Sequence, residues 1–263
     1  MHGAIVVVDP DGPVASAGEI DRPFALASIT KLFTATAVHV AVEEGTLALE
    51  DPAGPEDSTV AHLLAHASGL GPDGQVLSAP GRRRIYSNAG YDSLGHVTAT
   101  ASGMDFSRYA SEAVVDALGL THTSLTGSPA ADASASPRDV AALVSAWLVP
   151  GALLSAETVE AAARPFLGDL AGVLPGFGSQ TPNDWGLGPE IRGHKSPHWT
   201  GSRNSASTFG HFGQAGTCCW VDPVHRGAMV WLGDAPFGPW ATSLWPALSD
   251  AVLDDLAARR GPS

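Results

Sequence analysis

The chain has 263 residues, of which 44% are hydrophobic and 16% charged, a balance that excludes a disordered protein and is typical of a compact globular one. Lysine and arginine number 14 against 27 aspartate and glutamate residues, and a net charge of −13 excludes the broad basic surface of a nucleic-acid-binding protein. No stretch of about 18 apolar residues occurs, so we predict no membrane insertion.

The N-terminal residues predict a β-hairpin. Residues 3–8 and 13–18 favour strands, and they flank Asp9-Pro10-Asp11-Gly12, whose Pro-Asp-Gly sequence is typical of a turn. The first ten residues have no basic segment, only a very short apolar run and no small-residue cleavage site, so we predict no signal peptide and expect a cytoplasmic protein.

The order of the other predicted elements indicates the fold class. Apolar residues at helical spacing predict a buried helix between Ser28 and Gly45. Short helices are predicted over 60–66, 89–101, 106–118, 137–149 and 156–164, followed by strands over 185–188, 210–221 and 227–232 and a closing helix over 244–260. We therefore predict an α+β fold, with an antiparallel sheet built from both termini (residues 1–50 and 185–263) and flanked by helices, and an inserted all-helical domain (residues 51–184).

Three segments carry residues that suggest chemistry. Ser28 and Lys31 lie three apart at the start of the most apolar helix, where a lysine can help to deprotonate a serine, although Ser28 as a simple helix cap and Lys31 reaching solvent would also explain the pattern. Tyr86-Ser87-Asn88 precedes the next helix, where Tyr86 could move a proton and Asn88 could bind a carbonyl, or the two could merely pack and cap.

The third segment, Gly210 to Thr217, is rich in glycine where a strand is expected. Glycine weakens a strand interior, so its repeated use indicates the close approach of a ligand or of another backbone, although a β-bulge would explain this segment equally well.

In their order, these segments resemble the serine β-lactamase and penicillin-binding-protein superfamily, and most closely its class C β-lactamase-like branch of esterases, D-amino-acid peptidases and transacylases. The motifs are Ser-x-x-Lys at 28–31, Tyr-x-Asn at 86–88 and a glycine-terminated triad at 211–213, and residues 63–70 resemble the family's Leu-Leu-x-His-x-Ser-Gly-Leu segment. The resemblance covers almost the whole chain. It implies a β-lactamase/transpeptidase-like fold.

The resemblance also implies a role for each motif residue. Ser28 would be the acylated nucleophile and Lys31 its general base, while Tyr86 would share base duty and protonate the leaving group. Asn88 would orient the substrate. The backbone N–H groups of Ser28 and Gln214 would form an oxyanion hole. No metal and no organic cofactor is implied.

Two residues depart from the family pattern and bear on the substrate. Phe212 replaces the threonine or serine that helps to hold a β-lactam carboxylate, and His211 replaces a lysine before Gly213. These changes favour an apolar acyl group over a penicillin. We therefore predict a serine hydrolase or acyltransferase that acts on an ester or amide through an acyl-Ser28 intermediate, with a small-molecule acyl donor that a carrier protein could present.

Two other functions remain open at this stage. A β-lactamase or D-amino-acid carboxypeptidase would use the same motifs, and a non-catalytic domain of the same fold would bind an acyl ligand without turning it over. Against the second alternative, a domain without catalysis has no physical need for a lysine in an apolar helix.

Several other residues have a plain structural explanation beside a functional one. His62 and His66 have the spacing of a metal site but lack its usual glutamate, and His66 is better explained as bracing a loop. Arg82-Arg83-Arg84 could meet an anionic substrate or lie in a solvated loop. Cys218 and Cys219 are adjacent, so they point to opposite faces of a strand, form no ordinary disulfide, and at least one should be core.

Overall fold

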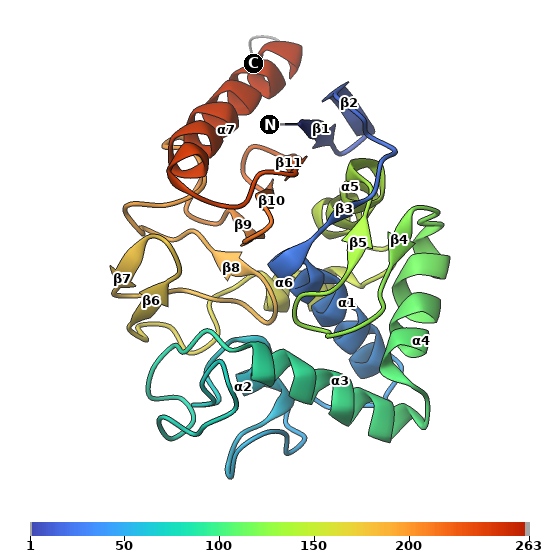
Figure 1. The fold of residues 1–263 in the computed structure, drawn as a ribbon, viewed down its shortest axis with the longest axis vertical. Coiled ribbons are helices and arrows are strands. Elements are labelled where there is room, and N and C mark those ends of the chain that lie inside the picture. The colour runs from blue at the N-terminus through green and yellow to red at the C-terminus, as the bar shows by residue number, and fades with distance from the viewer. Residues whose placement is uncertain (1, 261–263) are drawn as a thin grey trace.

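A computed structural model describes residues 2–260, so residue 1 and residues 261–263 of the predicted sheet domain lie outside the described residues. A six-stranded sheet in the order β2-β1-β11-β10-β9-β8 forms the centre of the molecule, and all its neighbouring strands are antiparallel (Figure 1). Its strands are β1 (Gly3–Asp9), β2 (Gly12–Ala17), β8 (Glu190–Ile191), β9 (Phe209–Gly213), β10 (Thr217–Asp222) and β11 (Gly227–Gly233). The first strands and the last ones therefore share one sheet.

The remaining elements surround this sheet or lie below it in Figure 1. The helices are η1 (Ala27–Ile29), α1 (Thr30–Glu43), α2 (Val60–Leu64), α3 (Asn88–Ser102), α4 (Phe106–Ala110), the π-helical turn η2 (Ser111–Asp116), α5 (Pro137–Leu148), α6 (Ala156–Ala162) and α7 (Pro239–Arg260). A second sheet contains β3 (Phe24–Ala25), β5 (Ser134–Ala135) and β4 (Thr123–Ser124), and β6 (Gly172–Leu174) pairs with β7 (Gly178–Gln180). Within the described residues, no helix has both the length and the apolar character needed to cross a bilayer.

Apolar side chains of the central sheet pack into a core on each face, because successive residues of a strand point to opposite sides. Val6 and Val8 belong to the apolar core that includes α1 and α5, whereas Val7 belongs to a second core with α7. Cys218 and Cys219 divide in the same way, and both are fully buried free thiols. The predicted separation of the two cysteines and the predicted burial of at least one of them are thus confirmed. The sheet forms the middle of three layers.

The structure confirms the α+β fold class, the opening hairpin and the closing helix. The strand predicted over 185–188 is wrong, because Gly188 turns the chain with a φ of +127° and only an isolated bridge joins Trp185 to Glu190. The segment 210–221 is two strands, β9 and β10, joined by a turn at which Gly216 has a φ of +89°.

The segment between residues 51 and 184 differs in part from the predicted helical insert. It contains four short strands besides its helices, and η2 replaces the second half of the helix predicted over 106–118. In addition, α5 packs against β1, β10 and β11, so part of this segment belongs to the sheet's own layers (Figure 1). The division at residues 51 and 184 stays a prediction.

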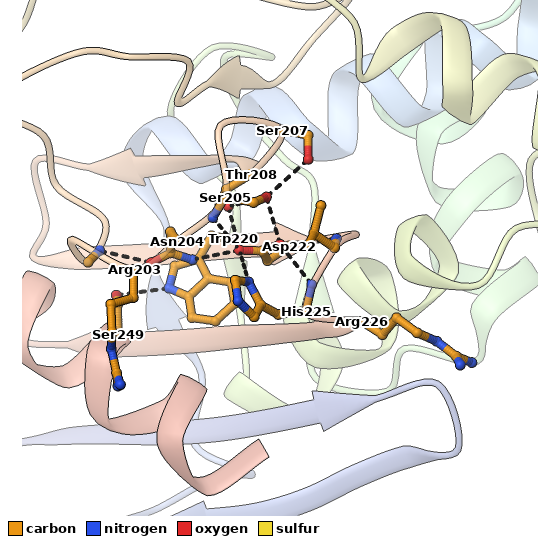
Figure 2. Close-up of polar contacts among 12 residues, drawn as sticks. Arg203, Asn204, Ser205, Ser207, Thr208, Trp220, Asp222, His225, Arg226 and Ser249 are labelled. Atoms are coloured by element: carbon orange, nitrogen blue, oxygen red, sulfur yellow. Dashed lines mark hydrogen bonds and ion pairs between the residues drawn. The ribbon is translucent and has the colours of Figure 1, made fainter. Parts of the chain in front are cut away.

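One end of the sheet is held by a buried carboxylate (Figure 2). Asp222, at the end of β10, accepts hydrogen bonds from the Thr208 hydroxyl and from the Ser205 amide, each at 2.8 Å, and from the His225 amide at 3.1 Å. Burial alone would raise the pKa of Asp222, but the hydrogen bonds from Ser205 and His225 lower it to about 2. The charged carboxylate therefore ties the loop before β9 to the β10–β11 turn.

Candidate active site

Ser28 lies in η1, directly before α1, at the N-terminal end of one continuous helical segment. The preceding residue, Ala27, has a φ of +48°, in the left-handed region that residues other than glycine rarely adopt. Backbone strain of this kind is concentrated at functional sites. The free amide groups at a helix start favour negative charge, which suits a serine that becomes an alkoxide-like nucleophile.

Lys31 lies one turn further along and is fully buried. Its Nζ atom donates to Asn88 Oδ1 at 2.7 Å and to the Ala130 carbonyl oxygen at 2.8 Å, and it lies 3.5 Å from Ser28 Oγ. Both carbonyl oxygens can only accept, so they take two of the amine hydrogens. In the free amine, the position that remains toward Ser28 is the lone pair.

The protonation state of Lys31 suits a group that accepts the Ser28 proton. Burial lowers the pKa of the Lys31 ammonium to about 7, because an apolar environment disfavours the charged form. A large fraction of the protein therefore carries a neutral amine at neutral pH. A lysine in this state can accept a proton from Ser28 Oγ.

Tyr86 contacts the same serine from the other side. Its hydroxyl lies 2.7 Å from Ser28 Oγ, and Lys31 Nζ lies 4.8 Å from the centroid of its ring. Burial raises the pKa of the Tyr86 phenol, so the group stays protonated at neutral pH and can donate to the serine oxygen. Ser28, Lys31, Tyr86 and Asn88 therefore converge, as the sequence motifs predict.

His66 holds Tyr86 and Asn88 in place. Its Nδ1 atom accepts the Ser87 backbone N–H at 3.1 Å, and its ring lies 4.5 Å from the Tyr86 ring and 4.6 Å from the Trp185 ring, between centroids. Burial, followed by the charges of Lys31 and its neighbours, lowers the pKa of His66 well below its usual value, so the imidazole is neutral. The interpretation of His66 as a loop-bracing residue is confirmed.

The end of β9 approaches the nucleophile so closely that only glycine fits there. A Cβ atom on Gly213 would lie 2.4 Å from the Leu26 carbonyl oxygen and 3.1 Å from Ala27 Cβ. Gly213 thus serves the close approach of another backbone, one of the explanations that the sequence left open. Gln214 follows directly and lines the same cavity as Ser28, so their backbone N–H groups can serve as an oxyanion hole.

We expect Gly213→Ala to lower the rate of Ser28 acylation about a hundredfold or more, because the added methyl group must push β9 away from η1 and displace the Gln214 N–H donor. Intact-mass spectrometry of adduct formation over time would measure this rate. Gly168→Ala is the matched control, because a Cβ there meets nothing within 4 Å and no unusual backbone angle is required. Equal acylation rates in the two variants would contradict the assignment.

His211 and Phe212 do not form a site for a carboxylate. His211 Nδ1 lies 2.7 Å from the Phe212 carbonyl oxygen, which can only accept, so Nδ1 carries the proton and Nε2 is unprotonated. Burial and the nearby Lys31 lower the pKa of His211 to about 3, so the side chain carries no charge at neutral pH. Phe212 has no hydroxyl, and it packs among Phe177, Trp199 and other aromatic rings while lining the cavity.

The cavity at Ser28 is narrow and largely apolar. It encloses about 360 Å³, counting its open mouth, and it is lined by Ser28, Tyr86, Leu174, Pro175, Trp185, Glu190, His211, Phe212 and Gln214. Of the predicted site residues, Ser28, Tyr86, His211, Phe212 and Gln214 line this cavity, and Lys31 and Asn88 lie behind Ser28, with Lys31 Nζ 3.5 Å from Ser28 Oγ.

The sequence analysis missed Glu190. This carboxylate is 2% exposed, and it binds the Lys195 ammonium, His198 Nε2 at 3.0 Å and Trp199 Nε1 at 2.7 Å. Burial alone would raise the pKa of Glu190, but His198 and Lys195 lower it to about 2. The sequence signal for this cluster was that Lys195, one of only two lysines, lies close to Glu190 and His198 in the chain.

The remaining candidates have structural partners. Arg84 is buried, and its guanidinium donates to the carbonyl oxygens of Asn183, Ala65, Phe166 and Leu167, so it is a brace and not a solvated side chain. Arg82 and Arg83 are exposed. His62 packs on Phe166, and its Nδ1 atom lies 2.9 Å from the Thr59 hydroxyl. These partners differ from those of His66.

Comparison with known proteins shows which solved structures share this fold. A beta-lactamase from Mycobacterium bovis is 49% identical, with a TM-score of 0.95 over 97% of this chain and 95% of that chain. An unliganded simvastatin synthase from Aspergillus terreus is 17% identical and has a TM-score of 0.81 over 97% of this chain and 94% of that one, which shows the fold alone. The predicted β-lactamase/transpeptidase-like fold is thereby confirmed.

The curated relatives share shorter regions. A beta-lactamase from Pseudomonas fluorescens is 29% identical over 128 residues, which are 38% of this chain and 36% of that protein. The matches span 36% and 47% of the lengths of the curated relatives. The family model described as Beta-lactamase matches residues 2–248, and the chain therefore belongs to the beta-lactamase family.

Proposed function

We propose that this protein is a serine hydrolase or acyltransferase that cleaves an uncharged ester or amide through an acyl-Ser28 intermediate. The observation that carries the proposal is the position of Ser28 Oγ, 2.7 Å from the Tyr86 hydroxyl and 3.5 Å from Lys31 Nζ. The Tyr86 distance is within direct reach for proton transfer, and the longer Lys31 distance is of the kind that shortens when a substrate binds.

In the acylation step, the free amine of Lys31 accepts the Ser28 proton while Oγ attacks the substrate carbonyl carbon. The carbonyl oxygen becomes an oxyanion, which the backbone N–H groups of Ser28 and Gln214 stabilise. The carbon–oxygen or carbon–nitrogen bond to the leaving group then breaks, and the Tyr86 hydroxyl gives its proton to the leaving atom. The Lys31 ammonium returns a proton to Tyr86, which restores the phenol.

In the second step, the acyl group moves from Ser28 to an acceptor. Water gives hydrolysis, and an alcohol or amine gives acyl transfer. The acceptor gives its proton to the Tyr86 oxygen while Tyr86 passes its own proton to the free amine of Lys31, and the Lys31 ammonium then reprotonates Ser28 Oγ as it departs. The donor is a small molecule, free or attached to a carrier.

The charges around the cavity support an uncharged substrate. His211 is neutral, and the one ionised side chain that lines the cavity is the Glu190 carboxylate. A substrate carboxylate would meet no unpaired cation among the lining residues, because the Glu190 carboxylate is already paired with the Lys195 ammonium. Leu174, Trp185 and Phe212 instead offer apolar surface to an acyl group.

A second candidate is a β-lactamase or a D-amino-acid carboxypeptidase. The 49% identity to a solved structure that carries the name beta-lactamase favours it. Both candidates use an acyl-Ser28 intermediate, so the rates with different acyl donors distinguish them. A non-catalytic acyl-binding domain would form no turnover product with any donor.

The proposal can be tested by intact-mass spectrometry of the protein and its Ser28→Ala variant after exposure to a fluorophosphonate, a short-chain aryl ester and a penicillin. We expect one adduct per chain that Ser28→Ala abolishes, and faster acylation by the ester than by the penicillin. Faster acylation and turnover of the penicillin would favour the β-lactamase candidate. No adduct from any donor, in protein shown by circular dichroism to be folded, would exclude the acyl-enzyme mechanism.

A further inference from the structure

A second hollow adjoins the Ser28 cavity. It encloses about 690 Å³, counting its open side, and Tyr86 and Pro175 line both spaces. Its other lining residues are Pro72, Leu77, Arg83, Arg84, Ile85 and Val173. We call this hollow the side groove. The Tyr86 ring is therefore a shared wall, with its hydroxyl at Ser28 on one side.

The banks of the side groove expose apolar side chains to solvent. Leu77 on one bank is 53% exposed and Val173 on the other is 55% exposed, and Val76, next to Leu77, is 64% exposed. Most other large apolar side chains of the described chain are covered. Apolar surface that is gathered beside a catalytic cavity indicates a binding surface.

The backbone holds these side chains in place. On the first bank, the Leu77 amide donates to the Gly69 carbonyl oxygen at 2.9 Å, and Val76 forms a bridge with Leu70. On the second bank, Val173 belongs to β6 and pairs with Ser179 of β7.

The two banks are tied together at Arg84. Its backbone forms a bridge with Gly172 and its amide donates to the Ala171 carbonyl oxygen at 2.9 Å, while its buried guanidinium donates to four carbonyl oxygens. The side groove is therefore a preformed feature, which lowers the entropy that the protein itself loses when a ligand binds.

We propose that the side groove binds an apolar chain on the leaving-group side of the ester. This inference rests on the proposed function. The atom that receives the Tyr86 proton must lie within hydrogen-bond distance of the Tyr86 hydroxyl, so the leaving group begins beside Tyr86. The acyl group occupies the cavity at Leu174, Trp185 and Phe212, on the other side of the same ring. A chain that extends from the leaving oxygen past Tyr86 and Pro175 enters the side groove.

The occupant is therefore the alkyl part of a long-chain alcohol. In hydrolysis this alcohol is the leaving group. In acyl transfer the same step runs in reverse and the alcohol is the acceptor, because the leaving oxygen and the attacking oxygen occupy the same position. Each methylene that the groove buries contributes up to about fourfold in binding. An alcohol chain of several carbons should therefore be preferred over ethanol by one to two orders of magnitude.

The test uses two ester series kept below the concentrations at which they form micelles. In the first, acetate esters of 1-alkanols from ethyl to octyl vary the leaving group, with released alkanol measured by gas chromatography. In the second, p-nitrophenyl esters from acetate to octanoate vary the acyl group. The readout is the ratio of kcat/KM between the longest and the shortest member of each series. Variants are Leu77→Ser and Val173→Ser, and Val224→Ser is the matched control, because Val224 is also well exposed (66%) and lies outside the groove lining, in the β10–β11 turn.

We expect the octyl-to-ethyl ratio to be about tenfold or more in the parent protein, and to fall about three- to tenfold in Leu77→Ser and Val173→Ser but not in Val224→Ser. The octanoate-to-acetate ratio of the second series should not change in any variant. A flat alkanol series in protein that still acylates Ser28 would overturn the side groove alone. Variants that change only the acyl series would overturn its assignment to the leaving group. Protein that no ester acylates would overturn the proposed function and the groove together.

Discussion

Replacing Lys31 with methionine should lower the rate of Ser28 acylation by about 10²- to 10⁴-fold, the usual contribution of a positioned general base. The reason is geometric, because Lys31 Nζ is held by Asn88 Oδ1 and the Ala130 carbonyl oxygen with one position left toward Ser28. Methionine has a similar length but no basic atom. We expect the variant to stay folded, since it buries no ammonium. Adduct formation with a short-chain aryl ester, followed by intact-mass spectrometry, measures the effect.

The pH dependence of the parent protein tests the same assignment. With a pKa of about 7, Lys31 is protonated and inactive as a base at lower pH, so the acylation rate should fall about tenfold per pH unit below 7 and reach a plateau above it. At pH 5, about 1% of the amine is neutral. The pH profile of single-turnover acylation gives this midpoint directly.

Lys31→Arg is the control that separates charge from basicity. Arginine keeps a cation at the position but stays protonated at every pH of the assay. We expect this variant to be as slow as Lys31→Met. Acylation in Lys31→Met within tenfold of the parent rate, or a profile with no inflection near pH 7, would show that another group removes the Ser28 proton.

Removing the Glu190 carboxylate should have the largest effect on stability. Glu190→Leu leaves the buried Lys195 ammonium without its counter-ion and Trp199 Nε1 without its acceptor. Loss of one partner of a buried ion pair typically lowers the free energy of unfolding by about 3–5 kcal/mol. Urea unfolding followed by tryptophan fluorescence measures the difference, and Trp199 is itself a reporter in this cluster.

The pH dependence of this contribution has a definite sign. The pKa of Glu190 is about 2 in the folded protein and lies near 4.5 in an unfolded chain, so the carboxylate stabilises the fold above pH 4.5 and loses this effect as the pH falls toward 2. Unfolding of the parent protein should therefore become easier over that range. Glu190→Leu should lack this component of the acid dependence.

Two variants define what the Glu190 experiment measures. Glu112→Gln removes one partner of the exposed Arg108–Glu112 pair and should change the free energy of unfolding by at most about 0.5 kcal/mol. The double variant Glu190→Leu/Lys195→Met removes both charges and should recover part of the loss. A single Glu190→Leu variant as stable as Glu112→Gln would mean that the buried pair is not a major source of stability.

Local sequence patterns identified the elements that depend on neighbouring residues. The Pro-Asp-Gly turn predicted the β1–β2 hairpin, and Ser28 and Lys31 could be placed on one helix face, because residues three apart on a helix are adjacent. The strand alternation also predicted the separation of Cys218 from Cys219. The strand expected over 185–188 failed because Gly188 adopts a positive φ, which no hydrophobic pattern reveals.

The sequence by itself determined the α+β class and, through three motifs that resemble a known family, which serine, lysine and tyrosine are proposed as nucleophile, base and acid. Only the tertiary structure decided how these groups act. The Ala130 carbonyl oxygen that orients Lys31 is 99 residues away from it in the sequence. Glu190, which lines the cavity, is held by His198 and Trp199 of the loop that follows β8. The neutral state of His211 follows from burial. Contacts of this kind depend on packing between distant segments, which leaves no periodic signal in the chain, whereas turns and helix faces are set by residues a few positions apart.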